Sequence, residues 1–195
     1  MSTVDTSHAA AATTSTPAST STSSTGGETC LPTLLSTLKI TIHPEIYVFA
    51  TIPSSHFHGT GTGSAAFAIP LSDVLLFFRE PCTTSSHAGT GTGARAETPS
   101  DDPKITLILR RETAERYAAH ASTLFTLTYE FPCRLLTCDV HSSLSAVGFM
   151  AVLATRLAER GISVNPVAGF YHDHLFVPVE RAGEAVEMLE GLTAG

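Results

Sequence analysis

The amino-acid sequence predicts an α+β fold in which helices cover one face of an antiparallel sheet. The main observation is the order of apolar segments between residues 134 and 192, which reads strand, helix, strand, strand, helix. A short polar connection joins two of these strands, as in an antiparallel hairpin. The first half adds further strands without the strict strand–helix alternation that a parallel sheet requires.

Composition limits the size of the fold and the class of partner. The chain has 195 residues, 43% of them hydrophobic, which allows one ordinary domain or two small domains in contact. The formal net charge is −7 and no cluster of Lys or Arg occurs, so we expect neither nucleic acid nor an anionic membrane as a partner. No apolar run approaches the roughly 20 residues that cross a bilayer.

Cysteine usage predicts a reducing compartment. The four cysteines form no CxxC pair, and Cys133 and Cys138 lie on one predicted strand with side chains on opposite faces, so they cannot bridge. The N-terminus lacks the basic and apolar regions of a secretion signal. We therefore expect a cytoplasmic protein with reduced thiols.

The first half begins with a low-complexity segment. Residues 1–29 are mainly Ser, Thr and Ala, and they have too few large apolar side chains to fold, so we predict a disordered tail. Residues 82–103 are rich in Ser, Thr, Gly and Pro and are predicted to be an insertion. The sequence between and after these segments predicts helices at 31–38 and 112–121 and strands at 46–52, 74–79, 104–111 and 124–131. Pro44 interrupts the first strand pattern, and Pro132 is expected to end the last.

The second half has a clearer pattern. A strand at 135–140 runs into a predicted helix that Ser142 or Ser143 caps, that contains Gly148 and that ends at Gly161. The buried stripe of this helix is expected to comprise Leu144, Val147, Met150, Ala151, Ala154, Leu157 and Ala158. Strands at 162–168 and 175–179 follow, and a last helix occupies 180–192.

Three runs in this half, VHSSLSAVG, GISVNPVAGFYHDHLFVP and the following ERA, carry a family resemblance. They resemble an ACT domain, in particular the second module of small tandem-ACT proteins related to the CASTOR arginine sensors and to aspartate kinases. The first half is similar more weakly, through EIYVFATIP, LFFRE and KITLILRRETAERY. The resemblance implies two ferredoxin-like βαββαβ modules, at residues 31–132 and 133–195, with the 82–103 insertion in the first.

The resemblance also implies a ligand site. ACT modules bind a small effector, commonly an amino acid, near the first strand–helix turn and the second strand, at an interface between modules or across a homodimer. The corresponding residues here are His141, Ser142, Ser143, Leu144, Asn165, Pro166 and Val167, with Tyr171, His172, Asp173 and His174 as supporting residues. A helix N-terminus suits a carboxylate, and Asn165 has both a donor and an acceptor, so we expect Ser143 and Asn165 to lie side by side. The alternative is that Ser143 only caps the helix and Asn165 only precedes Pro166.

Three other chemistries have weaker support. His141, His172, Asp173 and His174 are metal-ligand types, but no HExxH or paired-Cys motif accompanies them, and Asp173 fits a hairpin turn. The GTGTG runs at 59–63 and 89–93 lack the Lys-Ser/Thr ending of a phosphate-binding loop. A Ser–His–Asp triad around His141 lacks the GxSxG motif. We expect a non-catalytic regulatory protein without a metal or cofactor. A metal-dependent enzyme and a pure interaction module with the tail as a tether are the alternatives.

Overall fold

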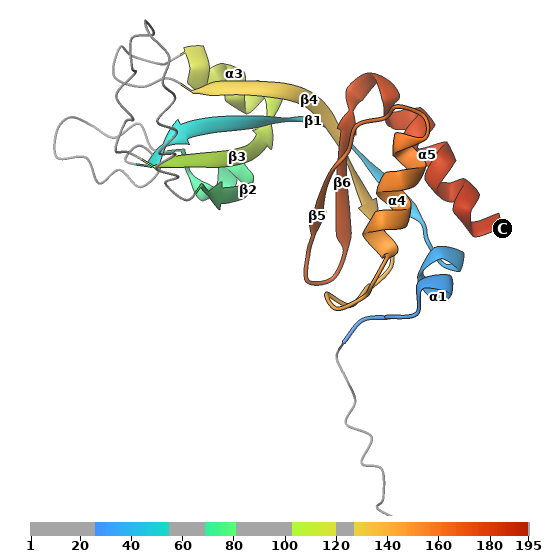
Figure 1. Cartoon of the computed structure of the whole chain (residues 1–195). Helices are drawn as coiled ribbons and strands as arrows, with labels where there is room; N and C mark the ends of the chain where they lie inside the picture. The colour runs from blue at the N-terminus through green and yellow to red at the C-terminus, as the bar shows by residue number, and fades with distance from the viewer. Residues whose placement is uncertain (1–25, 55–68, 81–102, 120–126, 195) are drawn as a thin grey trace, which may run out of the picture.

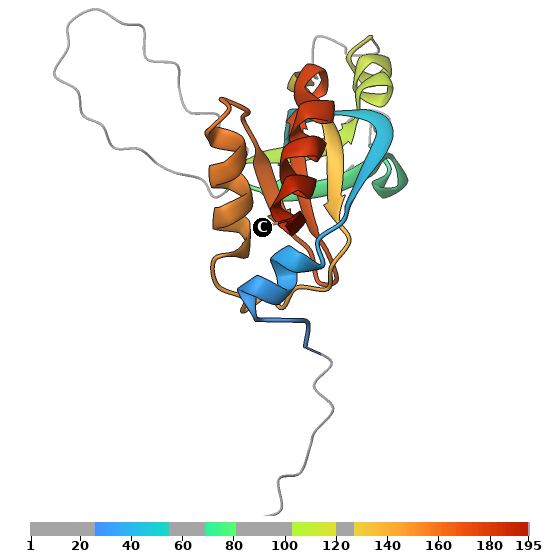
Figure 2. The same cartoon turned by 90° about the vertical axis from the view of Figure 1, so that its right-hand side faces the viewer.

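A computed structural model describes residues 26–54, 69–80, 103–119 and 127–194. Six strands form one sheet, and helices cover one of its faces (Figures 1 and 2). The elements are α1 (Leu31–Ser36), β1 (Ile40–Pro53), η1 (Leu71–Asp73), β2 (Val74–Arg79), β3 (Lys104–Arg110), α3 (Arg111–Ala119), β4 (Thr128–Cys138), α4 (Phe149–Ala158), β5 (Asn165–Ala168), β6 (Asp173–Pro178), η2 (Val179–Arg181), α5 (Ala182–Glu190) and η3 (Gly191–Ala194). In these ranges no helix has the length and apolar character needed to cross a membrane.

The sheet has the strand order β2-β3-β1-β4-β6-β5, and every neighbouring pair is antiparallel. The two long central strands are each used by both halves of the fold. The C-terminal part of β1 pairs with β3 and with the start of β4, whereas its N-terminal part pairs with the end of β4, which in turn pairs with β6. The result is two four-stranded sets, β2-β3-β1-β4 and β1-β4-β6-β5, that share β1 and β4. The predicted α+β class with two tandem modules is confirmed.

The apolar core has three parts. Beneath α1, α4 and α5, the strands β4 and β6 bury Leu136, Cys138, Leu175 and Val177 against helix side chains that include Leu34, Phe149, Leu153 and Leu189. A second cluster lies under α3 and contains Val48, Ala50, Ile52, Ile105, Leu107 and Leu109. The third cluster, on the opposite face, joins Tyr47, Ile108, Cys133, Leu135 and Phe176. Cys133 and Cys138 therefore do face opposite sides of the sheet.

Two predicted strand ends are wrong, because prolines lie inside strands at bulges. β1 passes through Pro44, and β4 passes through Pro132. The pairing shifts register between Ile42 and Ile46 of β1, where the guanidinium of Arg134 donates to the carbonyls of His43 (3.2 Å) and Pro44. A second shift accommodates the Phe131–Pro132 step, with Phe131 at φ 58°. A bulge leaves one residue out of the ladder, so a proline there removes no ladder hydrogen bond.

The predicted start of the main helix in the second half is also wrong. α4 begins at Phe149, and its N-cap is Gly148 at φ 91°, a conformation that favours glycine. Residues 139–147 form a loop, so Leu144 and Val147 are 67% and 85% exposed and not part of a buried stripe. Phe149, Leu153 and Leu157 are the buried side chains of α4.

Several predictions fall on residues outside the described ranges. They are the tail up to residue 25, both GTGTG runs, nearly all of the 82–103 insertion and the start of the predicted strand at 124–131. The module boundary between residues 132 and 133 stays a prediction. The structure adds that α1, which precedes β1 in the chain, packs into the same core as α4 and α5.

Candidate functional site

Two connections meet at one end of the sheet (Figure 1). The 139–148 loop joins β4 to α4, and the 169–172 turn joins β5 to β6. The ring centroids of His141 in the loop and Tyr171 in the turn are 5.7 Å apart, and His172 Nε2 lies 3.9 Å from Asp139 Oδ1. The structure thus brings His141 of the predicted loop residues beside Tyr171 of the predicted supporting residues.

A buried polar contact fixes the loop to the hairpin. Ser142 is 6% exposed and Asp173 is 4% exposed, and the Ser142 hydroxyl donates a hydrogen bond to Asp173 Oδ2. Asp173 is the first residue of β6, paired with Cys138 and Ala168, and not the turn residue that we predicted. Because a buried carboxylate is costly without a donor, this bond holds the loop in one position on the strand.

Neither Ser142 nor Ser143 caps a helix, because the N-cap of α4 is Gly148, and the capping prediction is therefore wrong for both serines. The Ser143 hydroxyl has a different contact. Its Oγ lies 2.9 Å from the Oγ of Ser145 and accepts a hydrogen bond from the Ser145 amide at 3.3 Å. The Ala146 amide donates to the Ser143 carbonyl at 2.8 Å. The serine-rich sequence therefore closes a local turn inside the loop, six residues before α4 begins.

Three histidines lie beside this end of the sheet. Thr137 Oγ1 is 2.9 Å from His43 Nε2 and 3.0 Å from His174 Nδ1. Burial lowers the pKa of His174. The neighbouring His172 and His43 lower this pKa further, and the Asp173 carboxylate acts in the opposite direction. Within the described ranges, no three His, Cys, Asp or Glu side chains are grouped so that they could hold a metal ion.

The structure does not bring Asn165 to the same place, whereas Val167 pairs with His174, one of the predicted supporting residues. Asn165 pairs with Phe176 and Ala168 with Asp173, so Asn165 lies three residues along β6 from the Ser142 contact. That separation is about 10 Å at the rise of a strand. Residues 165–167 instead line a hollow of about 320 Å³ together with Phe49, Leu76, Phe78, Glu80, Thr106 and Ile108 of the first half. Ser143 and Asn165 are therefore at opposite ends of the β5–β6 hairpin.

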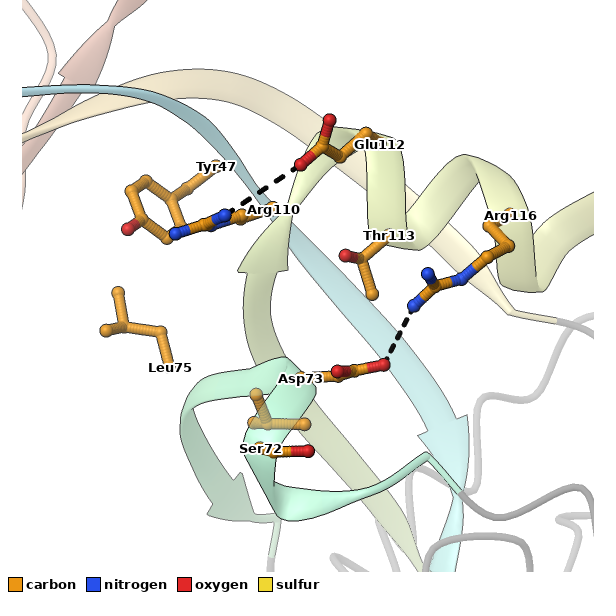
Figure 3. A pocket seen from close by; sticks show the side chains of 9 residues that line it. Tyr47, Ser72, Asp73, Leu75, Arg110, Glu112, Thr113 and Arg116 are labelled. Carbon is orange, nitrogen blue, oxygen red and sulfur yellow. Dashed lines mark hydrogen bonds and ion pairs between the residues drawn. The ribbon is translucent and has the colours of Figure 1, made fainter.

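Sequence reasoning missed another hollow, of about 450 Å³, at the junction of β3 and α3 (Figure 3). Arg116 contacts Asp73 at 2.8 Å, and Arg110 lies 3.2 Å from Glu45 and 4.0 Å from Glu112. Each guanidinium thus has a carboxylate of the same chain as its partner. The only sequence signal is the run Arg110-Arg111-Glu112 at a strand–helix junction, because Asp73 is remote in the chain.

Comparisons with known proteins agree with this architecture. ACT-domain family models match residues 129–191 and 26–81. A crystal structure of a Vibrio cholerae protein of unknown function, described as a possible transport protein, is 30% identical, with a TM-score of 0.55 over 84% of this chain and 95% of that one. No match was found among curated proteins.

Solved structures of aspartate kinases and of an aspartate kinase regulatory subunit share the fold at low identity. The regulatory subunit from Thermus flavus is 8% identical, with a TM-score of 0.52 over 79% of this chain and 96% of that chain. The aspartate kinase from Synechocystis is 10% identical, with a TM-score of 0.53 over 80% of this chain and 27% of that chain. Fold and comparisons together define a protein of two ACT-type modules and do not favour the metal-dependent enzyme. The chain belongs to the ACT-domain family, with two ACT domains in tandem.

Proposed function

We propose that this protein is a non-catalytic sensor that binds a small effector, an amino acid, at the 139–148 loop. One observation carries the proposal: the loop joins the strand β4 to the helix α4 within the matched ACT domain, and the buried Ser142–Asp173 bond fixes its backbone. The family resemblance implies an effector at this strand–helix turn. A loop that is already fixed loses little entropy on binding, which favours affinity for a small ligand.

The surroundings of the loop support a site that a second copy of the chain completes. Leu144, Val147, Phe170 and Tyr171 are 67%, 85%, 64% and 63% exposed, and they belong to the 139–148 loop and the adjoining 169–172 turn. Clusters of exposed apolar side chains mark interfaces more often than free surface. In the proposed homodimer the 139–148 loop of each copy faces the same loop of the other copy. The effector lies between the two loops, where little water is present.

Asn165, Pro166 and Val167 have a different proposed role. They line the hollow between β5 and strands β1, β2 and β3, where the two halves of the fold meet. The strand β6 connects the two places, because its residue Asp173 pairs with Ala168 at one end of β5 and its residue Phe176 pairs with Asn165 at the other. An effector bound at the 139–148 loop can therefore change how the hairpin packs on the first half, provided that it binds one packing more tightly than the other.

A thermal-shift screen of the proteinogenic amino acids at millimolar concentration, combined with light scattering, tests this function. Leu144→Asp and Leu71→Asp are matched variants, because these leucines are 67% and 66% exposed and only Leu144 lies in the loop. We expect one amino acid to raise the melting temperature, and Leu144→Asp alone to abolish both this shift and the dimer. A dimer that forms with no amino-acid response supports the pure interaction module instead. A response that both variants retain contradicts a site at the loop.

A further inference from the structure

The segment just before α1 is bound to the 139–148 loop by its main chain. The Glu28 amide donates to the carbonyl of His141 at 2.8 Å, and the Ser143 amide donates to the carbonyl of Glu28 at 2.9 Å. The two chains therefore form a single parallel bridge between Glu28 and Ser142. Among the described residues no further pairing continues this bridge, because α1 follows at Leu31 and leads into β1, and β1 pairs antiparallel with β4.

The main-chain groups that Glu28 uses in this bridge correspond to the amino and carboxyl groups of a free amino acid. An α-amino acid carries its nitrogen and its carboxyl carbon on one Cα, as Glu28 carries its amide nitrogen and its carbonyl. Its ammonium can donate to the His141 carbonyl, and its carboxylate can accept from the Ser143 amide, each in place of a Glu28 group. The charged groups of a free amino acid would make stronger hydrogen bonds than the neutral peptide groups do.

We infer that Glu28 occupies the His141 carbonyl and the Ser143 amide, the two groups that would bind the ammonium and carboxylate of the effector. The Gly26–Thr29 segment and a free α-amino acid therefore exclude each other. This inference rests on the proposed function and adds two things to it. It names the ligand class by the groups that are recognised, an unblocked ammonium and carboxylate on one carbon. It also makes the segment before α1 an intramolecular competitor.

The local structure allows this segment to leave without unfolding the protein. Leu34 and Leu38, which follow it, are 1% and 2% exposed in the core, so α1 stays anchored. Glu28 itself is held on the loop only by the two main-chain bonds, while its side chain turns back to accept from the amides of Thr29 and Cys30, both at 2.7 Å. An opening that breaks two hydrogen bonds of an exposed segment is of the low-energy, local kind.

Gly27 supplies the test, because its contact with the loop tolerates no side chain. A Cβ at Gly27 would lie 2.5 Å from the His141 carbonyl oxygen and 2.6 Å from the Ser142 carbonyl carbon, whereas a Cβ at Gly26 would meet nothing within 4 Å. Gly27→Val should therefore detach the segment, and Gly26→Val is the matched control. Glu28→Pro, which removes the amide donor, detaches it by another route.

Two measurements on the full chain separate this inference from the proposed function. Hydrogen exchange at the Ser143 amide, without any ligand, should quicken in Gly27→Val and Glu28→Pro and stay at the wild-type rate in Gly26→Val. Titration with each proteinogenic amino acid should then give about tenfold or more tighter binding in the two detached variants, if the wild-type site is free only a tenth of the time or less. Methyl esters and N-acetyl derivatives of the bound amino acid should not bind.

Each other outcome has a defined meaning. If exchange at Ser143 stays slow in both detached variants, the segment does not control the loop and the inference is wrong. If exchange quickens and an amino acid binds with wild-type affinity, the inference is wrong while the proposed function stands. If exchange quickens and no amino acid binds any variant, both are overturned.

Discussion

The Ser142 hydroxyl donates a hydrogen bond to the Asp173 carboxylate, and this contact joins the 139–148 loop to the first residue of β6, 31 residues further along the chain. Both side chains are buried. The loop that bears the proposed effector site thus has its position fixed by a strand of the same module. The proposed function depends on this placement.

Replacing Ser142 with alanine removes the donor and leaves the Asp173 carboxylate buried. We expect the free energy of unfolding to fall by about 1–3 kcal/mol, because a buried acceptor loses a partner. Ser143→Ala is the control, since that hydroxyl contacts only Ser145 in a local turn and its loss should change the free energy by less than about 0.5 kcal/mol. Equal losses in urea denaturation of the two variants would refute the structural role of the buried bond.

Arg134 should stabilise the bulge of β1 that contains Pro44. One guanidinium nitrogen, Nη1, donates to the carbonyls of both His43 and Pro44, and lysine lacks the rigid planar group that holds this nitrogen between them. We expect Arg134→Lys and Arg134→Ala both to lower the free energy of unfolding, by about 1–3 kcal/mol for the alanine variant. Arg156→Ala, which breaks an exposed helical ion pair with Glu159, should cost less than about 0.5 kcal/mol. A lysine variant as stable as the wild type would show that the planar guanidinium group is not needed at this bulge.

His174 should make stability depend on pH on the acidic side of neutrality. Its pKa is lowered from 6.5 in the folded protein, first by burial and then by His172 and His43, so the unfolded chain binds a proton more readily. The stability that neutral His174 provides is therefore complete above about pH 6.5 and is lost as the pH falls through the lowered pKa. Comparing the pH dependence of unfolding in wild type and His174→Gln isolates this effect. Identical pH profiles would mean that the imidazole is not protected from protonation.

The described thiols should differ in reactivity by position. Burial raises the pKa of Cys133 and of Cys138 to about 12, with the Asp173 carboxylate adding to the effect at Cys138. Cys30 is exposed, and hydrogen bonding to Thr33 lowers its pKa. Because the thiolate is the reactive form, iodoacetamide should modify Cys30 well before the other two. Peptide mapping with Cys30→Ser as the control checks this order, and early labelling of Cys133 or Cys138 would contradict the packing of both faces.

Much of the fold could be predicted because the periodicity of apolar residues determines it. The bounds of β2 match residues 74–79, and β3 and α3 differ from their predictions by one or two residues at most. The strand ends predicted at Pro44 and Pro132 are wrong, because the sequence does not distinguish a proline at a bulge from a proline that ends a strand. The helix start predicted before Gly148 is wrong too, because a glycine at a left-handed N-cap looks like a glycine inside a helix.

The candidate site was predictable only in part, for a reason of geometry. The histidines, serines and Asp173 meet because β4 and β6 are paired neighbours. The order of elements in the sequence predicts the β5–β6 hairpin but does not by itself place β6 beside β4. Asn165 lies at the far end of β5, and its position depends on strand register, which periodicity alone does not determine. The Glu28 bridge arises from a segment that composition assigns to a disordered tail. Only tertiary contact with the loop orders it.

Amide chemical shifts of the full-length Gly27→Val chain, labelled with 15N and titrated with the proteinogenic amino acids, test the central claim most directly. The account predicts that one amino acid shifts the Ser143 amide and its neighbours in the 139–148 loop, and that the shifts saturate. Saturable shifts confined to the Asp73–Arg116 hollow or to residues 165–167, or no shifts with any amino acid, would contradict it.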